Sequence, residues 1–119
     1  MLNLDTHILV FALSGDLTSR ERGLLSTQRW SISAIVLWEL VKLAQLGRIE
    51  LDIDSGEFGR FLAPVHVWPL TLDVCGCIRK LDFKSDPADE LICATSIVHE
   101  VPLLTRDRKI RKSSVVPFA

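Results

Sequence analysis

The side chains best suited to chemistry in this sequence are five carboxylates that follow or interrupt apolar segments. They are Asp5, Glu39, Asp86, Asp89 and Asp107. Carboxylates brought within a few ångströms repel one another and take up protons, unless a divalent cation offsets their charge. Oxygen ligands without a cluster of His or Cys favour Mg²⁺ or Mn²⁺. Such a site is suited to phosphodiester hydrolysis, because the metal activates water and neutralises charge on the phosphate.

Each of these acids also has a simpler structural interpretation. Asp5 can act as a turn residue or cap the helix that follows it. Asp86 and Asp89 fit the N-cap and N3 positions of one helix, where negative charge is favourable. Glu39 can pair with Lys42 on a thin solvent-facing stripe of its helix. The residues alone leave both interpretations open.

The segments that would position these acids alternate between strand and helix. We predict strands at 2–5, 29–33, 65–70, 103–105 and 115–116, and helices at 6–13, 18–27, 34–46, 55–62, 71–81 and 86–99. This alternation predicts a single α/β domain over residues 1–119, with a central parallel sheet between helix layers. Ligands of such sheets collect at the carboxyl edge of the strands, and Asp5 and Asp107 would both lie there.

Local signals define several of these boundaries. Thr18 and Glu21 have the spacing of a capping box, and Ser33 can cap the helix that follows it. Gly47 fits the position just after a helix end. Pro69 interrupts the third strand, which indicates an edge position in the sheet.

Composition excludes some classes of protein. Hydrophobic residues make up 48% and charged residues 24% of the chain. No apolar run is long enough to span a membrane, and the N-terminal stretch lacks a basic region, so we expect a cytoplasmic protein without a signal peptide. Cys75, Cys77 and Cys93 are odd in number and lack zinc-site spacing. We therefore expect reduced, buried thiols.

The net charge is −1, but residues 106–112 carry five basic side chains and one acidic side chain. A basic concentration on an acidic body suits a phosphate-bearing ligand bound at one place. The commoner meaning of such a run is a solvated helix face. If the run binds phosphate, we expect some of its five basic residues to contact an RNA backbone. These residues are Arg106, Arg108 and Lys109, together with Arg111 and Lys112.

Five stretches of the chain match the motifs of a known family in order: LDTHIL at 4–9, SAIVLWEL at 33–40, GRI at 47–49, DPADELICAT at 86–95 and LLTRD at 103–107. In this order they resemble PIN domains, specifically the VapC-type toxin ribonucleases of type II toxin–antitoxin pairs. No single stretch is specific, but the ordered set is, and it covers essentially the whole chain.

The resemblance implies a three-layer α/β/α sandwich and a metal-binding quartet. The quartet comprises Asp5, Glu39, Asp89 and Asp107, with Mg²⁺ or Mn²⁺ as the cofactor. The small hydroxyl residues Thr6 and Thr105, and the acid Asp86, match positions that orient the carboxylates or the waters around the metal. The resemblance also implies cleavage of RNA, a homodimer and a cognate antitoxin partner.

The sequence departs from the family pattern beside the site. The family often has His-Arg before the Asp-Pro pair and Arg after the second Asp, where this chain has Lys84, Ser85 and Glu90. A base beside the site is thereby replaced with an acid, which changes the expected contacts with RNA but leaves the quartet intact.

The antitoxin is expected to insert a basic side chain among the carboxylates. Arg suits this role better than Lys, because its planar fork matches carboxylate geometry. The rest of the partner would lie along apolar helix surface near the N-terminal hairpin, where Leu13, Leu17 and Leu24 are expected to be exposed.

Two alternatives belong to other functional classes. A receiver-type signalling domain has a similar length and strand–helix pattern, but Asp52 and Asp54 do not follow an apolar strand as a phosphoacceptor would. A PIN fold that only binds RNA is the second alternative, and the four filled quartet positions argue against it.

Overall fold

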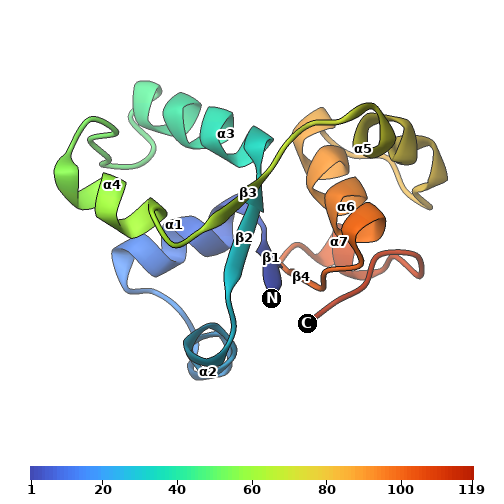
Figure 1. Cartoon of the computed structure of the whole chain (residues 1–119), viewed down its shortest axis with the longest axis horizontal. Helices are drawn as coiled ribbons and strands as arrows, with labels where there is room; N and C mark the ends of the chain where they lie inside the picture. The colour runs from blue at the N-terminus through green and yellow to red at the C-terminus, as the bar shows by residue number, and fades with distance from the viewer.

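A four-stranded parallel sheet forms the centre of the computed structural model, which describes residues 1–119 (Figure 1). Its strands are β1 (Leu2–Leu4), β2 (Trp30–Ser33), β3 (His66–Trp68) and β4 (Leu103–Leu104), in the order β3-β2-β1-β4. All three neighbouring pairs are parallel. This confirms the predicted parallel sheet, and β3, the strand followed by Pro69, lies at one edge as expected.

Helices cover both faces of this sheet. They are α1 (Thr6–Ser14), α2 (Ser19–Thr27), α3 (Ala34–Gln45), α4 (Gly56–Leu62), α5 (Leu72–Cys77), α6 (Pro87–His99) and α7 (Arg108–Arg111), with a 3₁₀ turn at Ile78–Lys80. Figure 1 shows α1, α3 and α4 on one side of the strands and α5 and α6 on the other. The predicted three-layer arrangement is therefore confirmed.

Local capping explains where several helices begin and end. The capping box that joins Thr18 and Glu21 is formed in both directions at the start of α2. The Ser33 side chain accepts a hydrogen bond from the Ile35 backbone at the start of α3. Gly47 follows α3 with a φ of 72°, a left-handed conformation that glycine adopts without a steric cost.

The core fills both sides of the sheet. Leu4 of β1 and Ile32 of β2 are fully buried, as are Ile8 of α1, Leu40 of α3 and Ile92 of α6. The two central strands, β1 and β2, have helices on both faces, so almost all their side chains are buried, including the polar Asn3, Ser31 and Ser33. Each large apolar side chain in the core contributes about 2 kcal/mol by leaving water.

One buried polar side chain fixes α6 against the sheet. The Asn3 side-chain amide, in the middle of β1, donates to the Ile92 backbone oxygen at 3.2 Å and to Ser96 Oγ at 2.9 Å. Asn3 is fully buried, so these bonds replace the contacts with water that its amide nitrogen loses on folding, while its Oδ1 is left without a partner. They set the position of α6 relative to β1.

The C-terminal part of the chain differs from the prediction in two places. The expected helix over 71–81 is the shorter α5 followed by the 3₁₀ turn at Ile78–Lys80. The expected strand at 115–116 is absent, and Phe118 instead forms an isolated parallel bridge with Leu103. Pro117 accounts for the interruption, because its nitrogen has no hydrogen to donate to a neighbouring strand.

Exposure also corrects two expectations. Helix α3, expected to face solvent only along a thin stripe, exposes Trp38, Val41 and the residue just after its end, Leu46, by 55%, 42% and 65%. Cys75 is half-buried, whereas Cys77 and Cys93 are buried as predicted, and all three are free thiols. None of the helices combines the length and the apolar character needed to cross a membrane.

Candidate active site

Asp5 lies at the carboxyl end of β1, where it is also the N-cap of α1. It is 5% exposed. Its Oδ1 accepts a hydrogen bond from the Thr6 backbone at 2.8 Å, and its Oδ2 accepts one from Thr105 Oγ1 at 2.6 Å. The two interpretations of Asp5, as a helix cap and as a candidate metal ligand, are therefore compatible. The capping hydrogen bond itself fixes the carboxylate at the edge of the sheet.

Glu39 reaches the same edge from the second turn of α3. Its Oε1 accepts a short hydrogen bond from Thr6 Oγ1. Burial raises its pKa above the ordinary value, and the like charges of Asp89 and Asp5 raise it further. Lys42 donates to Gln45 instead, so the expected Glu39–Lys42 pair is absent.

Asp89 enters from the first turn of α6. Its Oδ2 accepts a hydrogen bond from Ser85 Oγ at 2.8 Å. Its pKa is raised by burial first and then by the negative charges of Asp5, Asp107 and Asp86. These mutual effects mean that three elements, β1, α6 and the segment after β4, bring their acids to one place.

Ser85, which in the sequence is only a departure from the family pattern, places its hydroxyl on Asp89 in the structure. The Ser85 backbone also donates to Glu90 Oε2 at 3.1 Å. Asp86 occupies the N-cap position but makes no capping hydrogen bond, which corrects the expected capping role. The only available signal in the sequence was a hydroxyl residue four positions before a candidate ligand.

Asp107 follows β4 and caps the short helix α7. Its Oδ1 accepts from the Ile110 backbone at 3.0 Å, and its own backbone donates to Thr105 Oγ1 at 3.1 Å. Neither this cap nor the helix α7 was among the elements predicted from the sequence. Asp107 Oδ2 has no hydrogen-bond partner within the protein, so this oxygen remains available to a ligand.

The four carboxylates match the chemistry of a hard divalent cation, since all their donor atoms are oxygens. Glu39 Oε2 and Asp89 Oδ1 are, like Asp107 Oδ2, free of hydrogen bonds within the protein. No three His, Cys, Asp or Glu side chains stand close enough together to form a finished metal-binding cluster. The four acids therefore lie at one edge of the sheet and influence one another's charge. Some of their side chains would have to rotate to bind the same metal ion.

Cys93 lies beneath these acids on α6 and is fully buried. Burial raises its pKa far above the ordinary value, with further increases from the charges of Asp5, Asp89 and Asp107. Its thiol consequently stays protonated and acts as an apolar neighbour of the carboxylates rather than as a soft metal ligand.

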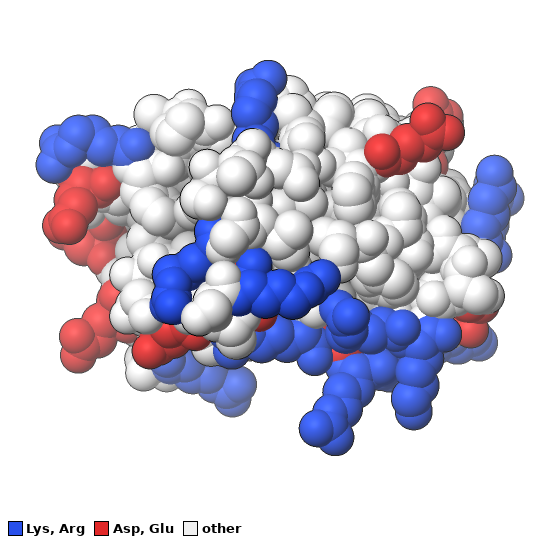
Figure 2. Space-filling view, turned by 90° about the horizontal axis from the view of Figure 1, so that it is seen from below, with Lys and Arg blue, Asp and Glu red and all other residues white.

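The basic residues after β4 divide into two groups. Arg106, one of the residues expected to contact RNA, donates from its guanidinium to both carboxylate oxygens of Glu21. Arg108 and Lys109 are exposed and have no carboxylate partner. Figure 2 shows a broad band of Lys and Arg side chains along the lower part of one face of the molecule.

An open hollow of about 500 Å³ lies beside this basic region. It is lined by Arg20, Glu21, Leu104, Thr105, Arg106, Arg108 and Arg111. Thr105 belongs both to this hollow and to the acidic site, because its hydroxyl donates to Asp5. Thr105 is thus the residue that the hollow shares with the acidic site, although none of the four acids lines the hollow.

Comparisons with known proteins agree with this geometry. The PIN domain profile matches residues 3–115. Ribonuclease VapC22 of Mycobacterium tuberculosis is 38% identical over 84 residues, which cover 68% of this chain and 65% of that protein. The chain thus matches slightly less than two thirds of this relative's length.

Two solved structures share the fold across nearly the whole chain. A toxin–antitoxin complex from Klebsiella pneumoniae matches with a TM-score of 0.71 and 21% identity, covering 94% of this chain and 91% of that one. VapBC2 from Rickettsia felis, bound to a promoter DNA fragment, matches with a TM-score of 0.75 and 20% identity, covering 100% and 98%. Together with the profile match and the acids at the edge of the sheet, these findings establish that the chain belongs to the PIN domain family.

Proposed function

We propose that the protein is a Mg²⁺- or Mn²⁺-dependent endoribonuclease of the VapC type, acting as the toxin of a toxin–antitoxin pair. The observation that carries the proposal is a group of four acids at one sheet edge without a basic partner. The only ion pair in the chain joins Glu21 and Arg106, outside this group. The similarity to a curated ribonuclease supports the same activity.

Asp5, Asp89 and Asp107 would hold the metal, with Glu39 as a further ligand or as the group that orients the attacking water. When bound, the metal would neutralise the carboxylates, activate water and stabilise charge on the phosphate and the leaving oxygen. Glu39 suits the orienting role, because its raised pKa makes it a better proton acceptor than an ordinary carboxylate.

Hydroxyl groups would keep three of these acids in place. Thr105 donates to Asp5, Thr6 donates to Glu39 and Ser85 donates to Asp89. Bonds of this kind fix the direction of a ligand's free lone pairs and hold it in a productive orientation.

Arg108 and Lys109 are the proposed contacts with the RNA backbone. They are exposed, they have no acidic partner, and they follow Asp107 directly. Phosphates held beside Asp107 would place a neighbouring phosphodiester bond over the acids. Such contacts position RNA without reading its sequence.

The decisive test is cleavage of RNA with Mg²⁺ or Mn²⁺, with excess EDTA, and by the Asp5→Asn variant. We expect cleavage that EDTA stops and that Asp5→Asn abolishes while the circular dichroism spectrum stays native. Asp54→Asn is the matched control, because Asp54 is an exposed acid in the loop before α4 and should cleave normally. RNA binding without any cleavage in either metal would instead favour a catalytically silent PIN module.

A cognate antitoxin is the proposed partner, as the solved toxin–antitoxin complexes of this fold suggest. A hollow of about 460 Å³ beside α1 is lined partly by Val10, Phe11, Leu13 and Leu51, which suits an apolar segment of such a partner. Leu13 is 36% exposed. Leu17 and Leu24 are partly buried against the core, so Leu13 alone remains of the three contacts first expected.

Coexpression tests this partner. We expect growth arrest from the chain alone, relief by the product of the neighbouring upstream reading frame, and loss of relief when that partner's Arg and Lys residues become Ala. A chain that is harmless alone and recovers no partner by affinity capture would indicate a solitary nuclease.

A homodimer is a further part of the proposal. Trp38, Val41 and Leu46 give α3 an exposed apolar surface, which in a soluble domain commonly marks an interface. Replacing Trp38 with Gln should shift the protein to the monomer in sedimentation velocity. An unchanged sedimentation coefficient would place any dimer contact elsewhere.

A further inference from the structure

We propose that Arg106 is a positioning residue, whose ion pair with Glu21 fixes the segment carrying Thr105 and Asp107 and thereby sets the arrangement of the acids. This inference rests on the proposed nuclease function. It assigns Arg106 a task different from phosphate binding, although the residue lies between the candidate ligand Asp107 and the strand β4.

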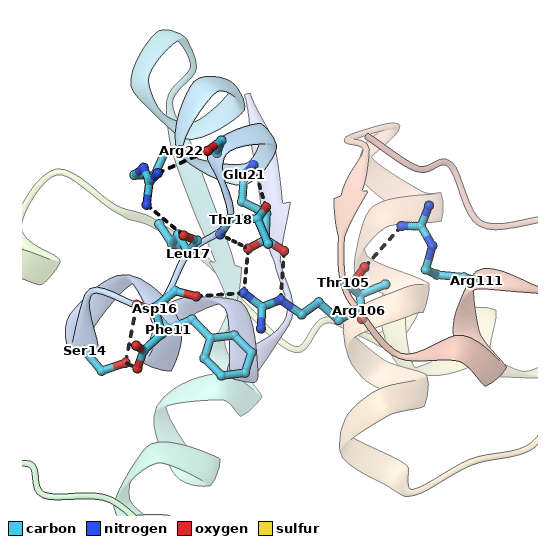
Figure 3. A network of polar contacts seen from close by, with 11 residues as sticks. Phe11, Ser14, Asp16, Leu17, Thr18, Glu21, Arg22, Thr105, Arg106 and Arg111 are labelled. Carbon is cyan, nitrogen blue, oxygen red and sulfur yellow. Dashed lines mark hydrogen bonds and ion pairs between the residues drawn. The ribbon is translucent and has the colours of Figure 1, made fainter.

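The contact between Arg106 and Glu21 has two parallel hydrogen bonds. Arg106 Nε donates to Glu21 Oε2 at 2.8 Å, and Arg106 Nη2 donates to Glu21 Oε1 at 2.7 Å. Figure 3 shows the guanidinium held in this fork between α2 and the segment after β4. A bidentate pair restricts the direction of both side chains as well as their separation.

Two further contacts hold the same guanidinium against the α1–α2 hairpin. Arg106 Nη2 donates to the Asp16 backbone oxygen at 2.9 Å. Its central carbon lies 3.8 Å from the centroid of the Phe11 ring, a cation–π distance. Arg106 therefore joins residues that are about 85–95 positions away in the sequence.

Glu21 is a rigid anchor for this contact. It is 5% exposed, and its Oε1 also accepts a hydrogen bond from the Thr18 backbone as part of the capping box of α2. Moving the carboxylate would break the capping box at the start of α2. Arg106 is consequently tied to a fixed point rather than to a mobile surface side chain.

The other end of the connection leads into the site. Thr105 Oγ1 donates to Asp5 at 2.6 Å and accepts from the Asp107 backbone at 3.1 Å. Arg106 lies between Thr105 and Asp107 in the chain. A displacement of its backbone would therefore move both the Thr105 hydroxyl, which holds Asp5, and the carboxylate of Asp107.

Charge separates this role from RNA binding. Nε and Nη2 of Arg106 are both occupied, and the charge of the guanidinium is matched by that of Glu21. Arg108 and Lys109 have no such partner and project positive charge to solvent. The two kinds of base should therefore affect different steps.

The test compares Arg106→Met and Glu21→Gln with Arg108→Met. Three quantities are measured: Mn²⁺ affinity of the free protein by calorimetry, kcat and KM for RNA cleavage, and RNA affinity with its salt dependence in EDTA. For Arg106→Met and Glu21→Gln we expect about tenfold weaker Mn²⁺ binding and a lower kcat, with unchanged RNA affinity. For Arg108→Met we expect weaker RNA binding, with Mn²⁺ affinity and kcat unchanged.

Arg106→Lys supplies a graded variant that keeps the charge but loses the fork, and it should fall between wild type and Arg106→Met. It also keeps the test informative if Arg106→Met does not fold. Weaker RNA binding and a flatter salt dependence in Arg106→Met, with unchanged Mn²⁺ affinity, would overturn the proposal. So would a lowered melting temperature with neither Mn²⁺ affinity nor kcat changed.

Hydrogen exchange separates failure of this inference from failure of the proposed function. The Asp107 amide is bonded to Thr105 Oγ1, so its exchange reports the order of this segment without metal or RNA. Faster exchange in Arg106→Met and Glu21→Gln, but not in Arg108→Met, would support the positioning role even in a chain that cleaves no RNA. Equal exchange in all variants would contradict it.

Discussion

Glu21 is buried and Glu39 is half-buried in the same chain, and their pKa values move in opposite directions. Hydrogen bonds from Arg106 lower the pKa of Glu21 to about 2, against a smaller opposing effect of burial. Burial raises the pKa of Glu39, and the charges of Asp89 and Asp5 raise it further. A guanidinium accompanies the first carboxylate, and only a neutral hydroxyl accompanies the second.

The difference shows how one fold contains acids of two kinds. A buried acid with a bidentate basic partner has its charge compensated, and removing that partner destabilises the native state because an uncompensated charge is left behind. A group of acids without a basic partner destabilises the native state at neutral pH until a cation binds. Burial of a carboxylate thus has two outcomes in this fold. At Glu21 a basic partner compensates the charge, and at the edge of the sheet the lack of such a partner leaves the acids able to bind a cation.

The largest expected effect separates the two acids at the start of α6. Asp89→Asn should lower kcat by about 100-fold, because it removes a proposed metal ligand that a hydroxyl already orients. Asp86→Asn should cost less than about tenfold, since Asp86 is exposed and forms no capping bond. Single-turnover cleavage measures both rates, and equal losses would show that Asp86 and Asp89 contribute equally to cleavage.

Stability should distinguish Glu21 from Glu39 directly. At pH 7 and without metal, Glu21→Gln should lower the free energy of unfolding by about 2 kcal/mol, because Arg106 loses its charged partner. Glu39→Gln should leave stability unchanged or raise it, because it removes a buried charge that is repelled by its neighbours. Urea unfolding measures both values, and a similar loss in both variants would contradict the comparison.

The exposed bases form the next test. Replacing Arg108 and Lys109 together with Ala should weaken binding to every RNA sequence by about tenfold at low salt. The salt slope should become shallower by about 1.4, as expected for two phosphate contacts with single-stranded RNA. Fluorescence anisotropy at several salt concentrations checks this. If affinity and slope both stay at wild-type values, the basic run is only a solvated helix face.

The smallest effect concerns pH. Because the pKa values of Glu39 and Asp89 are raised on folding, the native state holds protons there that the unfolded chain has released. Without metal, stability should therefore increase as the pH falls through these raised pKa values toward the ordinary carboxylate range.

Glu21 acts in the opposite sense at lower pH. Its lowered pKa gives stability that is present above the ordinary pKa near 4.5 and is lost as the pH falls toward 2. Metal-free protein should thus have a stability maximum in mildly acidic solution. Thermal unfolding across this range measures the maximum, and Mn²⁺ should remove the gain that comes from the raised pKa values of Glu39 and Asp89. A stability that falls steadily from pH 7 would contradict the raised pKa values.

Sequence alone determined the alternation of elements, the parallel sheet and most helix boundaries. The capping box at Thr18 and Glu21, the Ser33 cap and the glycine at position 47 are local signals, since each depends on residues within four positions. The identities of the four candidate ligands came from a resemblance in ordered motifs, and the structure places all four at one edge.

Tertiary structure decided the partners of individual side chains. Nothing near Arg106 in the sequence indicates that its charge is matched by Glu21, 85 positions away. The hydroxyl of Thr105 reaches Asp5 across 100 positions. The exposure of Trp38 and the single bridge at Phe118 likewise depend on which elements cover α3 and β4. Periodicity and capping are local properties, whereas hydrogen bonding and charge pairing depend on distances that exist only once the chain has folded.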